Sequence, residues 1–108
     1  MQAERLKLLV EILKAEPDDP FNIYVLALEY QKFDLNEAKF YFDNLLVDYP
    51  NYLATYYFAG KLYADLEQFD EAISIYNKGI ALAIASNKNK AEIELKRALR
   101  ALEDEIED

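Results

Sequence analysis

The sequence predicts an all-α protein built from repeated helical hairpins. Apolar residues recur at spacings of three and four along almost all of the 108 residues, and the two-residue alternation typical of strands is nowhere sustained. The chain also matches itself after a shift of 33–34 residues. The matched positions are Leu26, Ala27, Tyr30, Ala38 and Phe42 in the first copy and Ala59, Gly60, Tyr63, Ala72 and Tyr76 in the second. Such self-similarity over a helix pair indicates a solenoid of stacked hairpins.

The first two helices are expected at about 2–16 and 20–32. The first carries a stripe of leucine and valine and ends at "EPDDP", because proline cannot continue a helix. Asp19 is then the expected N-cap of the second helix, with Pro20 at its first position. The second helix is apolar nearly all round ("FNIYVLALEY"), so it should be covered on more than one side.

Two further helices are expected at about 34–48 and 52–66. Asp34 and Glu37, three residues apart, resemble a capping box at the start of the third helix, and Pro50 marks its end. The third and fourth helices therefore flank a short connection around Pro50.

The last two helices are expected at about 69–85 and 89–106, separated by "SNKN". The sixth is amphipathic, with one apolar stripe and an otherwise charged surface. Its apolar stripe comprises Ala91, Leu95, Ala98, Leu99, Leu102 and Ile106, and its basic residues are Lys88, Lys90, Lys96, Arg97 and Arg100. We interpret this helix as a solubilising cap whose charges are solvated.

Composition limits the possible functions. The chain has no cysteine and no histidine, which excludes thiolate nucleophiles, zinc sites, haem ligation by histidine and Ser-His or Cys-His catalysis. Carboxylate pairs such as Asp18–Asp19 and the run 103–105 lie in a turn and a tail, where nothing holds them around a substrate. No phosphate-binding glycine loop, calcium loop or metal-ligand cluster appears in the sequence. We therefore expect no catalysis, no cofactor and no metal.

Charge and hydropathy indicate where the protein is located and which partners it can bind. The net charge of −9 would repel nucleic acid, and no apolar stretch is long enough to span a membrane. The start "MQAERLKLLVEILKAEP" carries charges within its apolar run, so it does not resemble a signal peptide, and a cytoplasmic protein is expected. The acidic ending "EDEIED" is interpreted as a solvated helix end, with a dock for a basic partner as the alternative.

The joint spacing of the repeated residues resembles the tetratricopeptide repeat pattern W-x2-L-G-x2-Y…A-x3-F. In the second copy the pattern is carried by Tyr56, Ala59, Gly60, Tyr63, Ala72 and Tyr76, and in the first by Ile23, Leu26, Ala27, Tyr30, Ala38, Phe42 and Pro50. The resemblance covers roughly residues 2–85, and the whole chain is similar to small bacterial proteins with two repeats and flanking helices. It implies a right-handed α–α superhelix forming one domain. Its parts would be a half-repeat helix at 2–17, repeats at 20–50 and 53–85, and a capping helix at 89–106.

Three positions depart from the family pattern. Ile84 stands where the repeat usually has proline, and the turn within the first copy is one residue short. Glu67 occupies the place of the usual turn glycine in the second copy, so this turn is expected to be strained or differently shaped. Gly60, in contrast, fits the pattern: the resemblance implies that it lets two helices cross closely beside the ring of Tyr76. By the same argument Gly79 is expected where successive helical layers meet.

The resemblance also implies where a ligand would bind. In this family the first helix of each repeat lines a concave groove that holds an extended or helical peptide. The positions on that face are Phe21, Tyr24, Leu28, Gln31 and Lys32 in the first repeat and Ala54, Tyr57, Lys61, Ala64 and Asp65 in the second. Tyr24 and Tyr57 occupy equivalent places and could anchor a peptide. Alternatively, the last helix folds over the groove and both rings are core.

One subclass of the family clamps carboxylate tails with lysine and asparagine. Here Tyr24 and Leu28 hold those places in the first repeat, and Tyr57 and Lys61 hold them in the second. We therefore expect a hydrophobic or basic partner rather than an acidic one. The main functional hypothesis is a protein-binding module or scaffold; the alternative is a self-associating structural unit, such as a homodimer, with the groove capped by the last helix.

Overall fold

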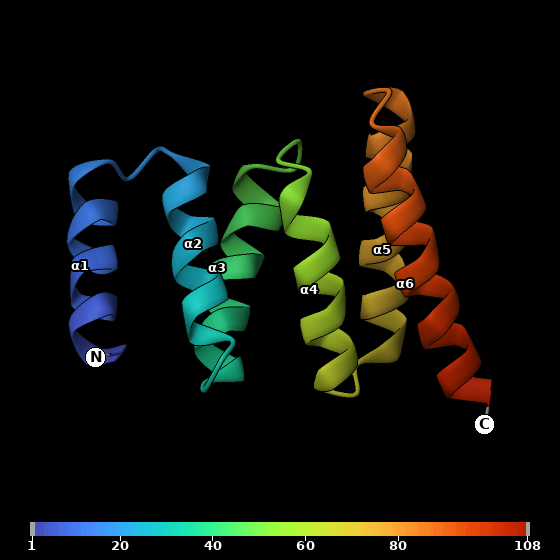
Figure 1. Cartoon of the computed structure of the whole chain (residues 1–108), viewed down its shortest axis with the longest axis horizontal. Coiled ribbons are helices and arrows are strands. Elements are labelled where there is room, and N and C mark those ends of the chain that lie inside the picture. The colour runs from blue at the N-terminus through green and yellow to red at the C-terminus, as the bar shows by residue number, and fades with distance from the viewer. Residues whose placement is uncertain (1, 108) are drawn as a thin grey trace. The chain divides into compact units, whose positions relative to one another are not determined.

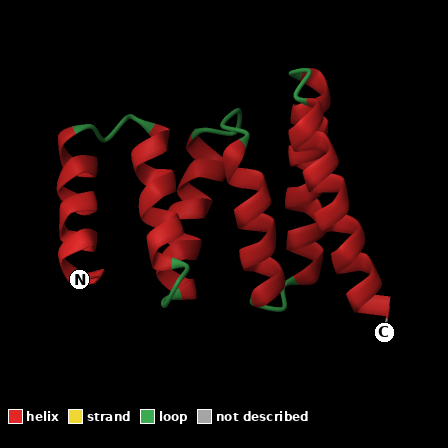
Figure 2. Cartoon of the chain, viewed as in Figure 1, coloured by secondary structure: helices red, strands yellow, loops and turns green. Residues whose placement is uncertain are grey.

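The computed structural model describes residues 2–107, and within them it contains helices and connecting turns but no strand (Figures 1 and 2). The helices are α1 (Gln2–Ala15), α2 (Pro20–Tyr30), α3 (Leu35–Asp48), α4 (Ala54–Asp65), α5 (Phe69–Ala85) and α6 (Asn89–Glu107). All six expected helices are present, and their ends lie within two residues of the predicted ones. The all-α prediction is therefore confirmed.

The chain divides into two compact units, and the first ends at Tyr52. In this unit α3 packs along α2, and α1 packs on another side of α2. The buried apolar residues of the unit are Ile23, Leu26, Ala27, Ala38, Phe42 and Leu45. All of them come from α2 and α3, whereas α1 buries no residue fully. The unit is thus a helical hairpin with a more exposed helix on its side.

The second unit begins at Leu53 and contains α4, α5 and α6. Here α5 packs against both other helices, and α6 also contacts α4. The buried apolar residues are Tyr56, Ala59, Leu62, Tyr63, Ala72, Ile75, Tyr76, Ala83, Leu95 and Leu102. The second unit is thus a three-helix unit in which α5 is the central helix.

Two helix starts have the predicted caps. The carboxylate of Asp19 accepts a hydrogen bond from the backbone N–H of Phe21 at 3.0 Å, and Pro20 occupies the first helical position. The carboxylate of Asp34 accepts one from the backbone N–H of Glu37 at 3.2 Å. Each cap satisfies an amide that has no partner inside the helix.

Two helix ends use residues with a positive φ. Glu67 has φ 61° after α4, and Asn87 has φ 57° after α5. Around Glu67, its own N–H donates to the carbonyl of Ala64, and the N–H of Gln68 donates to that of Tyr63. These two bonds form the Schellman arrangement, in which glycine is the usual left-handed residue. The turn therefore keeps the usual shape, and the departure from the family pattern is a non-glycine residue held at a positive φ, which is the strained alternative of the expectation.

Both glycines lie where a side chain would collide with a buried ring. A Cβ atom placed on Gly60 would lie 2.7 Å from Cδ1 and Cζ of Tyr76, and closer still to Cε1. A Cβ atom placed on Gly79 would lie 2.5 Å from Cβ of Tyr56 on α4 and 3.1 Å from Leu95 on α6. The predicted close crossing of α4 and α5 at Gly60 is confirmed, and Gly79 supports contacts with both neighbouring helices.

The predicted helix bounds need small corrections. The second helix ends at Tyr30 rather than at residue 32, because the N–H groups of Lys32 and Phe33 bond to the carbonyls three residues before them and tighten the chain into a turn. The fourth begins at Ala54 rather than at residue 52, since Tyr52 lies in a turn and donates to the carbonyl of Tyr49. The first, third and sixth helices each differ by one residue at an end, and the fourth also ends one residue earlier than expected, at Asp65.

Candidate functional site

The first half of the predicted groove lies on α2. Phe21, Tyr24 and Leu28 follow one face at helical spacing; Phe21 is exposed, and the other two are half-buried. Gln31 and Lys32 lie just beyond the helix, in the turn that leads to α3. The structure therefore provides a helical face only over the first three positions.

Tyr24 is held by a second aromatic ring. Its ring meets that of Tyr52 edge to face, with 5.7 Å between the centroids and 63° between the planes. Burial, with a smaller contribution from Tyr52, raises the pKa of the Tyr24 phenol. Tyr52 follows α3, so the contact joins the two ends of this hairpin. The contact of Tyr52 could not be predicted from the sequence, because its partner Tyr24 lies 28 residues away in the chain.

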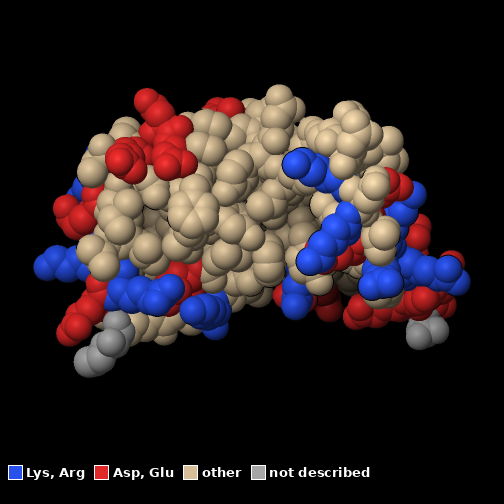
Figure 3. All heavy atoms as spheres, turned by 45° about the horizontal axis from the view of Figure 1, so that its top comes forward, with Lys and Arg blue, Asp and Glu red and all other residues tan. Residues whose placement is uncertain are grey.

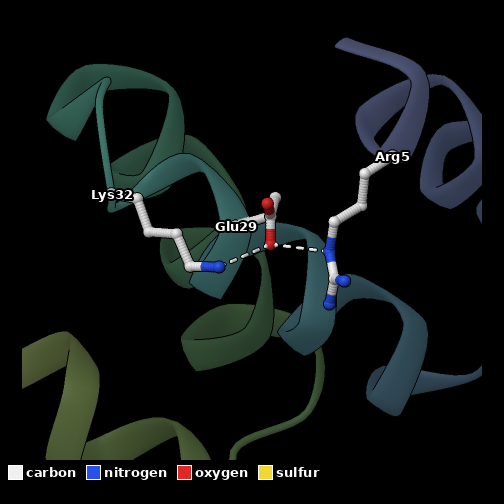
Figure 4. Close-up of polar contacts among 3 residues, drawn as sticks. All are labelled: Arg5, Glu29 and Lys32. Atoms are coloured by element: carbon white, nitrogen blue, oxygen red, sulfur yellow. Dashed lines mark hydrogen bonds and ion pairs between the residues drawn. The ribbon is translucent and has the colours of Figure 1, made fainter. Parts of the chain in front are cut away.

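Lys32 takes part in an ion-pair cluster centred on Glu29 (Figure 4). The carboxylate of Glu29 lies 3.1 Å from Nζ of Lys32 and 3.0 Å from Nε of Arg5 on α1. The hydrogen bond from Lys32 is the main reason that the pKa of Glu29 is lowered; burial opposes it, and the Arg5 charge adds to it. Glu29 itself is buried. Sequence reasoning missed this cluster, although an acidic residue inside the apolar run of α2 was a visible signal.

The second half of the predicted groove lies on α4, and it is more open. Ala54, Tyr57, Lys61 and Asp65 are exposed, and Ala64 is half-buried. The Tyr57 side chain keeps 38% of its surface exposed although α6 packs against α4 in the same unit. The alternative in which α6 buries this ring in the core is therefore wrong for Tyr57.

The open face of α4 lies near the buried ring of Tyr76. The pKa of Tyr76 is raised to about 12, mainly by burial, with smaller contributions from the nearby groups of Tyr57 and Asp65. Tyr57 also meets the ring of Phe58 edge to face, with 5.1 Å between centroids. Tyr57 and Asp65 on the exposed face of α4 thus lie close to a buried ring of the core of the second unit.

The described residues contain no group of three acidic side chains arranged to hold a metal ion. Among residues 2–107 there is also no helix with the length and apolar character needed to cross a membrane. Figure 3 shows a compact group of aspartate and glutamate at the upper left of the drawn face, and lysine and arginine beside acidic residues elsewhere, around broad uncharged areas.

Comparison with known proteins places this arrangement in a family. No family model matches the chain, and no curated protein matches it. Solved structures do. A crystal structure of a tetratricopeptide repeat domain protein from Salinibacter ruber is 39% identical, with a TM-score of 0.76, and the match covers 81% of this chain and 98% of that one. A solution NMR structure of a tetratricopeptide repeat domain protein from the same organism is also 39% identical, with a TM-score of 0.78 and coverage of 82% and 91%.

Helical hairpins that repeat along the chain, with glycine at the close approaches among α4, α5 and α6, define an α-helical repeat protein. At this identity and coverage, the chain belongs to the tetratricopeptide repeat family. Repeats of this family form a protein-interaction fold, and its members generally bind proteins or peptides. The family prediction made from the spacing of the repeated residues is confirmed.

Proposed function

We propose that this protein is a non-catalytic interaction module that binds a peptide or protein segment along α2 and α4. The proposal rests mainly on the exposed face of α4, where Tyr57 keeps an accessible ring between Ala54 and Lys61. Tyr24 occupies the equivalent place on α2, 33 residues earlier. Tyr24 and Tyr57 belong to different units, so we also propose that both rings line one concave groove.

The expected partner is hydrophobic or basic. The two tyrosine rings offer apolar area with a polar edge, which suits anchoring of apolar or amphipathic side chains. The net charge of −9 favours association with a basic segment and disfavours nucleic acid and acidic tails. We further propose that the chain acts as one domain in the bacterial cytoplasm, without a cofactor and without insertion into a membrane.

The test compares binding to candidate peptides by the wild-type protein and by the Tyr24→Ala/Tyr57→Ala double variant. NMR titration with amphipathic helical peptides should shift amides of α2 and α4, and the double variant should lose most of this response. Ile93→Ala is the matched control, since it removes an exposed apolar side chain from α6, outside α2 and α4. If the double variant responds like wild type, groove binding is refuted.

A second candidate function, self-association, is favoured by exposed apolar side chains on α1 and α5. Leu8 and Ile12 on α1 are 61% and 39% exposed, and Ile84 on α5 is 52% exposed. Such residues can be covered by another copy of the chain. Sedimentation velocity over a concentration series tests this function: a mass that stays monomeric at every concentration excludes it.

A further inference from the structure

Four aromatic rings form a continuous row in the first unit, and two of them flank the last predicted groove positions, Gln31 and Lys32. Phe33 contacts Tyr30 with 5.7 Å between centroids, and Tyr30 stacks on Tyr41 at 5.6 Å with only 9° between planes. Tyr41 in turn meets Phe40 edge to face at 5.1 Å. This row of rings thus begins in the turn after α2 and ends on the outer side of α3. We call these four residues the α3 aromatic face.

Both ends of this face are open to solvent. Phe33 is 52% exposed and Phe40 66% exposed, and Val47, two turns after Phe40 on the same side of α3, is 76% exposed. The opposite side of α3 carries the core residues Phe42 and Leu45. The exposed rings therefore contribute little to the core, and two large phenylalanine side chains remain available to a partner.

Carboxylates flank the α3 aromatic face. Glu37 lies three residues before Phe40 and four before Tyr41, so it shares their side of the helix. Burial raises the pKa of Tyr41, and the nearby Tyr30 and Glu37 raise it further. Asp48 lies one residue after Val47. Within residues 2–107 neither Glu37 nor Asp48 forms an ion pair, whereas Lys39 pairs with Asp43.

The charges around the face favour a cationic partner. The first unit carries ten acidic against five basic residues. An exposed ring beside a carboxylate suits arginine in particular, because the guanidinium can stack on the ring and donate two hydrogen bonds to the carboxylate. Lysine offers a more strongly hydrated point charge, which stacks less well. An uncharged proline-rich segment could use the rings but would gain nothing from the carboxylates.

We propose that the α3 aromatic face, together with Glu37, docks an arginine-bearing segment of another protein. This surface lies on α3 and the turn before it, and it shares no residue with the positions named for the groove on α2 and α4. The protein therefore has two interaction surfaces, and loss of one leaves the other intact.

The test uses two labelled peptides of equal length and charge, one with arginine and one with lysine, each spaced by glycine. In an NMR titration of the full chain, the arginine peptide should bind more tightly and shift the amides of residues 30–48. Phe40→Ala and Glu37→Gln should each weaken binding of the arginine peptide by about two- to fivefold. Because both side chains are exposed, these variants should keep the wild-type helical spectrum.

Two controls separate this proposal from the groove. Ile84→Ala removes an exposed apolar side chain from the second unit and should leave binding unchanged. Tyr24→Ala/Tyr57→Ala should also leave it unchanged. The proposal is overturned if no amide of residues 30–48 shifts at millimolar peptide, if lysine and arginine peptides bind equally and Phe40→Ala has no effect, or if the groove variant alone abolishes binding.

Discussion

Replacing Gly60 by alanine should destabilise the protein, although alanine is the better helix former. The new Cβ would lie 2.7 Å from two ring carbons of Tyr76, where ordinary contacts begin near 3.4 Å. Tyr76 is only 4% exposed, so its ring cannot turn out to solvent. We assign about 2–3 kcal/mol to this overpacking. The alanine recovers about 1 kcal/mol of helix propensity, which leaves a net loss of about 1–2 kcal/mol.

A double-mutant cycle isolates the contact. In a Tyr76→Leu background the ring is absent, so Gly60→Ala should stabilise the protein by up to about 1 kcal/mol. The assay is urea unfolding followed by far-UV circular dichroism. Ala81→Gly, at an exposed site within α5, measures propensity alone and should cost about 1 kcal/mol. If Gly60→Ala stabilises wild type and the Tyr76→Leu variant equally, the close crossing does not explain this glycine.

Three further predictions follow from other sites. Glu67→Gly should stabilise the protein by about 0.5–1 kcal/mol in urea unfolding, because glycine accepts φ 61° without strain; a loss of stability would contradict the Schellman explanation. Thr55 has a fully buried hydroxyl without a partner among the described residues, so Thr55→Val should raise the unfolding free energy by about 1 kcal/mol, whereas Thr55→Ser should not. The pKa of Glu29 is lowered from 4.5 on folding, so its contribution to stability is present above that pH and is lost as the pH falls through the lower folded-state value. Thermal melts from pH 5 to about pH 3 should therefore show a smaller acid-induced loss for Glu29→Gln than for wild type; equal losses would contradict the ion-pair cluster.

Much of the fold could be predicted because helical periodicity and caps are local signals. The spacing of apolar residues placed all six helices, and Asp19 and Asp34 marked two starts correctly. Gly60 could be assigned to Tyr76 because the repeat pattern relates positions on neighbouring helices. Glu67 was recognisable as unusual because a left-handed turn normally needs glycine.

The surface contacts could not be predicted in the same way. Periodicity shows which face of a helix is apolar, but not which side chain from another element meets it. The pairing of Tyr24 with Tyr52 and the ion pairs of Glu29 depend on how separate helices pack. The α3 aromatic face was missed for a different reason: exposed rings at helical spacing look the same in sequence as rings that will be buried.

The packing of α1 has a consequence for the dynamics of the protein. This helix has no fully buried residue, and the Arg5–Glu29 pair is its clearest polar link to α2. Few apolar contacts oppose its release, so α1 should open in local fluctuations that leave the α2–α3 hairpin intact. The amide hydrogens of α1 should then exchange with solvent faster than those of α2 and α3. Each opening would also briefly expose the carboxylate of Glu29.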